Sequence, residues 1–118
     1  MHLIELQSSW VSTATTRLTI VCDGGEGKIQ VDLIYKSELY GRTAYIWDLY
    51  IHPDHRRKGI ARQLMQQALH RARDFGFETA TLEWVLQDTP RHIAQWYARL
   101  GFEEREFSDE YALMVKKL

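Results

Sequence analysis

The residues with the clearest chemical potential form a basic stretch that contains a glycine, residues 56–62 (RRKGIAR). It stands between an apolar run typical of a buried strand, residues 44–51, and a run whose apolar residues have helical spacing, residues 60–75. The first turn of a helix leaves backbone N–H groups unpaired and carries the positive end of the helix dipole, so an anion is stabilised there. The stretch therefore predicts a phosphate or pyrophosphate site, although a solvated basic helix start would give the same pattern.

Alternating and periodic apolar residues predict the elements that must position this stretch. We expect strands at residues 3–6, 17–22, 28–35, 44–51, 79–85, 102–107 and 111–115, and helices at residues 60–75 and from Thr89-Pro90 to Gly101. Strand 44–51, its helix and strand 79–85 should form a right-handed βαβ crossover with parallel strands. The glycines at 24, 25 and 27 lie between two strands, so they predict a hairpin turn rather than a dinucleotide site.

The composition is that of a soluble globular domain. The 118 residues are 45% apolar and 26% charged, with a formal net charge of −1, and we expect one domain over residues 1–118. Such a balance argues against general affinity for nucleic acid or anionic membranes. The single cysteine, Cys22, excludes an internal disulfide, and no apolar run is long enough for a membrane span. These features predict a cytoplasmic protein.

Two motifs in this order resemble those of the GCN5-related N-acetyltransferase (GNAT) superfamily. Arg56-x-x-Gly59-x-Ala61 matches the Q/R-x-x-G-x-G/A signature, and residues 48–53 are similar to the strand that leads into it. Residues 97–102 (YARLGF) resemble the Y-x-x-x-G-F element of that family. The resemblance covers residues 44–118. It implies an α/β (α+β) acyl-CoA N-acyltransferase fold with a splayed mixed central sheet, helices on both faces, an acetyl-CoA donor and an amine acceptor.

The resemblance also implies which residues contact acetyl-CoA. Backbone groups of Leu49, Tyr50 and Ile51 would pair with the amides of the pantetheine arm, and an N–H at Ile51 could polarise the thioester carbonyl. The residues that would surround the pyrophosphate are Arg57, Lys58, Gly59, Ile60, Ala61 and Arg62, preceded by Arg56 of the signature. We expect no metal, because His52, Asp54 and His55 make a poor set of ligands beside three cations.

Three side chains are candidates for the chemistry. Tyr97 matches the tyrosine that in relatives donates a hydrogen bond to the departing sulfur, while its spacing alone would also fit a core aromatic residue. Glu83 resembles the glutamate that some relatives use as a base, and Asp48 is the competing carboxylate. A base is needed because a lysine-like ammonium has a pKa of about 10.4 and only the neutral amine is a nucleophile. An exposed strand position would equally explain Glu83.

Two departures from the family pattern affect the acceptor side. Relatives often have an asparagine where this chain has Pro90, so a cofactor contact there would fall to Gln87, Asp88 or Arg91. The N-terminal helical region is shortened, because the paired helices that commonly wall the acceptor pocket have no room beyond residues 8–16. The pocket would then be open, as for a bulky or protein acceptor, or be completed by a second chain.

The leading hypothesis is an N-acetyltransferase that moves the acetyl group of acetyl-CoA to a primary amine of a small molecule or protein by direct attack. The alternative is a noncatalytic acyl-CoA-binding or protein-interaction module with the same fold. A nucleic-acid-binding domain is disfavoured by the net charge of −1. Trp10, Tyr40 and Tyr45 could contribute to a homodimer contact. The acceptor, the acyl-chain preference and the oligomeric state stay open at this stage.

Overall fold

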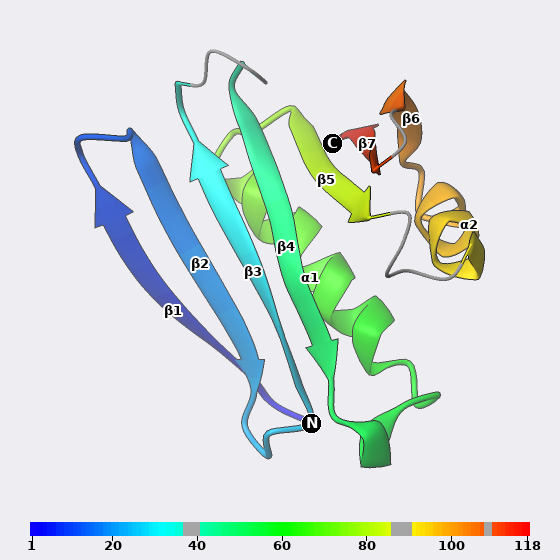
Figure 1. Cartoon of the computed structure of the whole chain (residues 1–118). Coiled ribbons are helices and arrows are strands. Elements are labelled where there is room, and N and C mark those ends of the chain that lie inside the picture. The colour runs from blue at the N-terminus through cyan, green and yellow to red at the C-terminus, as the bar shows by residue number, and fades with distance from the viewer. Residues whose placement is uncertain (37–40, 86–90, 108–109) are drawn as a thin grey trace.

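In the described residues, seven strands form one mixed sheet in the order β1-β2-β3-β4-β5-β7-β6 (Figure 1). The computed structural model describes residues 1–36, 41–85, 91–107 and 110–118. The elements are β1 (Leu3–Trp10), β2 (Thr15–Cys22), β3 (Gly27–Ile34), β4 (Thr43–Ile51), the short 3-10 helix η1 (Pro53–His55), α1 (Ile60–Asp74), β5 (Thr79–Val85), α2 (Arg91–Arg99), β6 (Glu103–Phe107) and β7 (Tyr111–Lys117).

The core lies on one face of the sheet, between the strands and α1. Leu18, Val31 and Ile46 are buried on neighbouring strands, where the register places them side by side. Helix α1 contributes a stripe of buried residues at three- and four-residue spacing: Ile60, Leu64, Met65, Ala68, Leu69 and Ala72. Each fully buried Leu or Ile contributes roughly 1.5–3 kcal/mol. This packing fixes α1, and with it the basic stretch, against β3 and β4.

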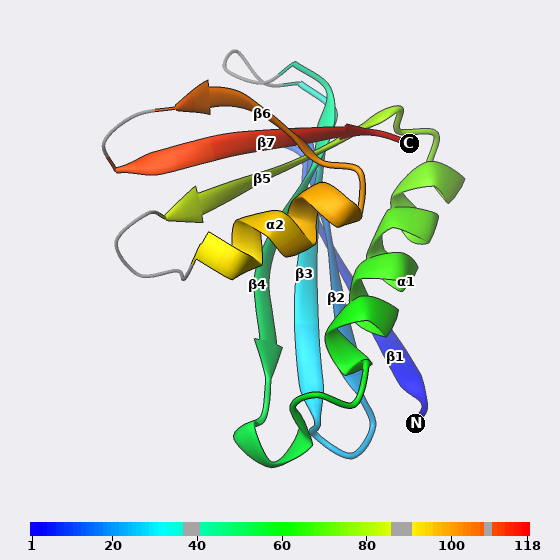
Figure 2. The same ribbon diagram turned by 90° about the vertical axis from the view of Figure 1, so that its right-hand side faces the viewer.

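Both helices lie on this same face (Figure 2). Ala94 of α2 clusters with Trp84 of β5 and Ala112 of β7. Alternation along these strands puts Trp84 on the side of Leu82, which belongs to the core cluster that includes the buried residues of α1. The mixed sheet is confirmed, but the expectation of helices on both faces is not met within the described residues. The opposite side, called here the helix-free face, is formed by residues such as Arg17, Gln30 and Tyr45.

The N-terminal region is a β-hairpin rather than a helical segment in the described residues. Strand β1 continues to Trp10 instead of ending at Leu6, and a short turn leads to β2, whose register pairs Trp10 with Thr15 and Leu3 with Cys22. The turn contains Ala14 at φ +46. The residues after Leu6 are polar and show no apolar alternation, so the sequence pattern did not predict that the strand continues. Their partners are supplied by β2, as in the contact of 3.2 Å between Ser9 Oγ and Thr16 Oγ1.

The expected βαβ unit is confirmed, and its two strands separate along their length. Within the described residues, β4 and β5 pair in parallel only at Ala44–Ala80 and Tyr45–Thr81. A buried contact of 2.8 Å between Thr43 Oγ1 and Thr81 Oγ1 holds this end together. Further along β4, the register with β3 shifts at Asp48, which has φ +53. Such a bulge bends the strand, and beyond Tyr45 β4 no longer pairs with β5 in the described residues.

Two smaller sequence features are also settled by the fold. Residues 24 and 25 form the predicted turn between β2 and β3, with the Gly25 N–H donating to the Cys22 carbonyl at 3.0 Å. Cys22 itself is buried, and this burial raises the pKa of its thiol. Neither helix in the described ranges is long and apolar enough to cross a membrane.

Candidate cofactor and acceptor site

A cleft of about 760 Å³ lies where the end of β4, the start of α1 and one side of α2 meet. This volume is typical of small-molecule sites. The lining residues are Leu49, Tyr50, Ile51, His55, Arg56, Arg57, Gly59, Ile60, Ala61, Arg62, His92, Ile93, Trp96, Tyr97 and Arg99. Of residues 49–51 and 56–62, which were expected to contact the cofactor, all are in the lining except Lys58, which is exposed outside it.

The start of α1 has the geometry of an open anion site. Gly59 is the N-cap at φ +77, and no side chain caps the helix there. A Cβ at Gly59 would meet no atom within 4 Å, so the backbone conformation, rather than a lack of space, selects glycine. The N–H groups of Ile60, Ala61 and Arg62 have no intrahelical acceptor in this first turn. They remain available to an anion in the cleft.

The formal charges around this turn act in the same direction as the helix dipole. The first turn of α1 contains no acidic residue, and Arg56, Arg57 and Arg62 all line the cleft. The Arg56 Nε donates to the Ile51 carbonyl at 3.3 Å, which ties the basic connection to the end of β4. Within the described residues, no group of three metal-ligating side chains forms a candidate metal site. The arrangement favours an anion with more than one negative charge.

The end of β4 lines the cleft, and two of its side chains anchor the strand in the core. Leu49 and Ile51 pack against the main core, as the sequence predicted, and Tyr50 is exposed. Gly27 makes this anchoring possible, because a Cβ there would lie 2.8 Å from both the Ile51 Cδ1 and the Tyr50 carbonyl oxygen. Strand β3 therefore needs a residue without a side chain where it meets the end of β4.

Tyr97 lies where the cleft meets a second cavity. It lines both the cleft and a smaller cavity of about 230 Å³, which also includes Asp48 and Glu83. Its ring packs edge-on against Phe102 at a centroid distance of 6.2 Å, and its carbonyl accepts a hydrogen bond from the Phe102 N–H at 3.1 Å. Gly101, at φ +97, allows the turn that brings Phe102 back. Burial raises the pKa of the Tyr97 phenol, so it remains a proton donor at neutral pH.

The two candidate carboxylates share the smaller cavity but differ in their surroundings. Asp48 is exposed on the helix-free face. Its Oδ2 lies 2.9 Å from the Lys28 Nζ and 3.5 Å from the Gln30 Nε2. The β4 bulge turns Asp48 toward these β3 residues. Glu83 is exposed on β5, opposite Leu113 of β7.

Sequence reasoning missed four cleft residues on α2, namely His92, Ile93, Trp96 and Arg99. His92 and Ile93 lie one helical turn before Trp96, and Arg99 lies one turn after it, so all four share one side of the helix. This periodicity was the signal that could have found them. Trp96 also packs beside Tyr97 at a ring-centroid distance of 5.4 Å. The expected contributions of residues 87–90, including the helix start at Thr89-Pro90, and of Tyr40 lie outside the described residues.

A family model described as "Acetyltransferase (GNAT) family" matches residues 14–102. The chain belongs to the GNAT family. This match confirms the resemblance carried by the basic stretch and the element at Tyr97. It extends beyond those two motifs to include β2 and β3, so the β2–β3 hairpin belongs to the matched region, whereas β1 precedes it.

Two related sequences and one solved structure show how far this GNAT chain resembles known proteins. An uncharacterised N-acetyltransferase of Methanocaldococcus jannaschii is 35% identical over 93 residues, which cover 78% of this chain and 40% of the relative. The aminoglycoside N(6')-acetyltransferase type 1 of Acinetobacter genomosp. 13 is 28% identical over 110 residues, covering 89% and 74%. The crystal structure of the PaiA N-acetyltransferase from Thermoplasma acidophilum in complex with coenzyme A superposes with a TM-score of 0.69 at 21% identity, covering 86% of this chain and 60% of that one. This chain thus spans less than half of the first relative.

Proposed function

We propose that this chain is an N-acetyltransferase that binds acetyl-CoA in the cleft and transfers the acetyl group directly to a primary amine. The observation that carries the proposal is the form of the cleft, which has an uncapped, arginine-lined helix N-terminus on one side and Tyr97 on the other. Membership of the GNAT family and the coenzyme A complex of the PaiA protein support the same donor. The single buried cysteine is compatible with a reducing, cytoplasmic location.

The binding roles follow from the free groups that line the cleft. The first-turn N–H groups of Ile60, Ala61 and Arg62 would hold the pyrophosphate, with Arg56 and Arg57 supplying charge. The backbone from Leu49 to Ile51 would pair with the pantetheine amides, because β4 has no ladder with β5 along this part in the described residues. Polarisation of the thioester carbonyl by the Ile51 N–H remains a prediction.

In the chemical step, the amine nitrogen attacks the thioester carbonyl carbon, the carbon–sulfur bond breaks, and the amine loses a proton. The Tyr97 phenol would donate a hydrogen bond to the departing sulfur, since burial keeps it protonated. A phenol is a weaker acid than a thiol, so donation without full proton transfer suffices. Glu83 would receive the proton of the amine. Asp48, whose Oδ2 lies 2.9 Å from the Lys28 Nζ, is the competing base.

The smaller cavity indicates how an acceptor would approach. It is bounded by Tyr45, Trp47, Asp48 and Glu83, and alternation along β4 and β5 places Tyr45, Trp47 and Glu83 toward the helix-free face. Carboxylates beside aromatic rings attract a cationic ammonium. The absence of a helix over this face among the described residues leaves room for an acceptor larger than a simple amine. A bulky amine or a protein amine is therefore the favoured acceptor.

Calorimetric titration with acetyl-CoA tests the donor site through the variant Gly59→Glu, which places a carboxylate at the proposed pyrophosphate site. The matched control is Gly25→Glu, because Gly25 has φ +79 and also has no atom within 4 Å of a built Cβ, but lies in the β2–β3 turn. We expect wild type and Gly25→Glu to bind alike and Gly59→Glu to bind at least about tenfold more weakly. Equal binding by both variants would exclude the proposed pyrophosphate site at the start of α1.

A noncatalytic acyl-CoA-binding module would give the same result in this titration, because it would also bind acetyl-CoA. The engagement of Asp48 by Lys28 gives this alternative some support, because it occupies one of the two candidate bases. A screen of amines for release of free CoA thiol separates the two functions. Thiol release that requires both an amine and acetyl-CoA identifies the enzyme, and binding without release by any amine class identifies the module.

A further inference from the structure

The two edges of the sheet are built differently. Edge strand β6 has five residues, carries three glutamates and one arginine, and its register shifts between Glu104 and Glu106. Short length, charge and bulges are the devices that protect an edge from pairing with another chain. Edge strand β1 has eight residues in unbroken register with β2, no proline, and Glu5 as its only charged residue. One edge is thus protected and the other is not.

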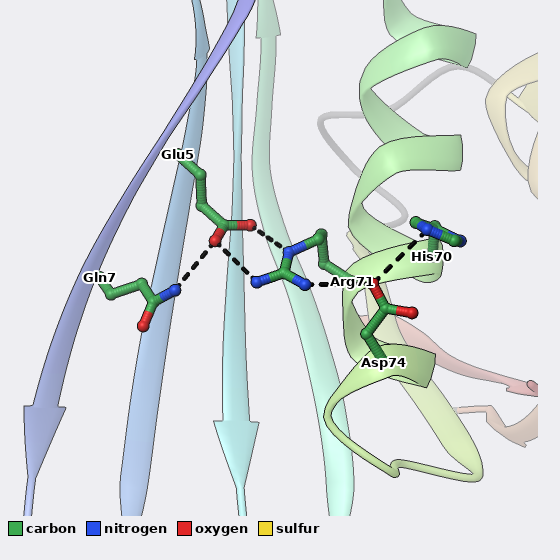
Figure 3. Close-up of polar contacts among 5 residues, drawn as sticks. All are labelled: Glu5, Gln7, His70, Arg71 and Asp74. Carbon is green, nitrogen blue, oxygen red and sulfur yellow. Dashed lines mark hydrogen bonds and ion pairs between the residues drawn. The ribbon is translucent and has the colours of Figure 1, made fainter.

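The charge on β1 does not protect its edge, because Glu5 points toward α1 (Figure 3). The Arg71 Nε lies 2.8 Å from the Glu5 Oε1 and the Arg71 Nη2 lies 3.1 Å from the Glu5 Oε2. Asp74 holds the same guanidinium at 3.1 Å, and the Gln7 Nε2 donates to the Glu5 Oε2 at 3.0 Å. This network fixes β1 in place. The edge is therefore an ordered template rather than a frayed strand.

The backbone of β1 offers a regular set of hydrogen-bonding groups. The Asp23 N–H donates to the His2 carbonyl at 2.9 Å, in the same register as the rest of the hairpin, which makes this a hydrogen-bonded pair. Such pairs alternate along an antiparallel ladder, so Ile4, Leu6 and Ser8 bond to β2. The residues between them turn their N–H and C=O groups toward the open edge: Leu3, Glu5, Gln7 and Ser9. In the described part of the chain, these groups have no strand partner.

Apolar side chains stand along the same edge. Ile4, Leu6 and Trp10 project from the helix-free side of β1 with exposed fractions of 41%, 59% and 42%. They form a row next to the outward-facing backbone groups. A strand that paired here would satisfy the backbone and cover part of this apolar row in one step.

We propose that β1 pairs with β1 of a second copy of this chain, antiparallel about a two-fold axis at Leu6, joining two seven-stranded sheets into one. The outward-facing groups allow only pairings between residues of the Leu3, Glu5, Gln7, Ser9 set. With Leu6 on the axis, Glu5 lies opposite the partner's Gln7, so the only charge of the strand meets an amide. The two Leu6 side chains then form a close, non-hydrogen-bonded pair.

A second copy fits this edge better than an unrelated strand because the strand is complementary to itself in this register, and two-fold dimers are the commonest assemblies. Strands β2 and β3 separate β1 from β4, so the cleft of each copy stays accessible in the dimer. The dimer does not depend on the proposed acetyl transfer, and its tests need no enzymatic activity.

The first test is sedimentation velocity of the full chain over roughly 1–200 µM, a range suited to weak or moderate dimers. We expect a dimer that Gln7→Pro weakens at least about tenfold, because proline removes an outward N–H while leaving the ladder to β2 intact. Gln7→Ala keeps the N–H and should preserve the dimer. A wild-type chain that stays monomeric at every concentration would overturn the proposal. It would do so even if β1 were then found to bind a strand of another protein.

The second test fixes the register in a Cys22→Ala background, which removes the native thiol. Leu6→Cys should form an intersubunit disulfide under mild oxidation, since Cα atoms in such pairs are about 4.5 Å apart. Ile4→Cys, on the same side of β1, should not cross-link, because the two Ile4 positions would lie roughly 13 Å apart along the strand. A dimer that tolerates Gln7→Pro and lacks the Leu6→Cys disulfide uses another surface and refutes this interface. If Gln7→Pro does not fold, the disulfide pair alone decides.

Discussion

Replacing Tyr97 with phenylalanine tests the proposed chemistry with little effect on packing. Phenylalanine keeps the ring that packs against Trp96 and Phe102, and loses only the hydroxyl. A hydrogen bond to a charged group contributes about 1.5–3 kcal/mol. If the phenol stabilises the departing thiolate, this corresponds to a loss of roughly 10- to 150-fold in kcat. Affinity for acetyl-CoA should stay within about twofold of wild type, because the proposed phosphate and pantetheine contacts are made by β4 and α1.

The assay is thiol release under saturating acetyl-CoA, with the amine found in the acceptor screen and with calorimetry for the donor affinity. Tyr35→Phe is the matched control, because it removes a phenol hydroxyl outside both cavities. Since burial raises the pKa of Tyr97, its contribution should persist up to about pH 10 and be lost only as the pH rises beyond that ordinary value. A kcat within twofold of wild type for Tyr97→Phe would remove this hydroxyl from the mechanism.

Three further predictions concern the base, the N-terminal ion pair and the β3–β4 contact. Glu83→Gln should lower kcat and abolish the acidic limb of the pH–rate profile, whereas Asp48→Asn should retain that limb. The hydrogen bond from Arg71 holds the pKa of Glu5 below its ordinary value of 4.5. Above that pH, the ion pair should therefore contribute about 1–2 kcal/mol to the free energy of unfolding, and this contribution should be lost as the pH falls through the lowered pKa. Urea unfolding at pH 7 and at pH 3 would measure the difference. Gly27→Ala should lower the free energy of unfolding by about 1–3 kcal/mol, seen as a lower Tm, because its Cβ would clash with β4.

Each of these has a result that would contradict it. An acidic limb that survives Glu83→Gln and vanishes in Asp48→Asn would exchange the two roles. A Glu5→Gln variant as sensitive to acid as wild type would show that the ion pair does not govern acid stability. Wild-type stability of Gly27→Ala would mean that β4 can shift to accept a methyl group. In that case the close approach would not be a constraint on the sequence.

Features encoded by neighbouring residues were determined by the sequence alone. The basic stretch, its glycine and the helix that follows are contiguous, so their geometry depends on local backbone preferences, and Gly59 occupies the N-cap position of α1 with a positive φ. The same holds for the turn at Gly101, which returns Phe102 to the Tyr97 ring. The order of strands and helices followed from the spacing of apolar residues, with shifts of a few residues at the ends.

Only the tertiary structure decided features that depend on distant partners. Strand β1 extends to Trp10 because β2 supplies partners for polar residues that have no strand preference of their own. The Asp48 side chain is exposed because a bulge in β4 turns it toward Lys28. The sequence contains no local pattern that marks such a register shift between strands. The helices share one face because the sheet topology sets which side the second helix covers. Pairing and burial across the chain outweigh local propensity at these places, since each involves residues well separated in sequence.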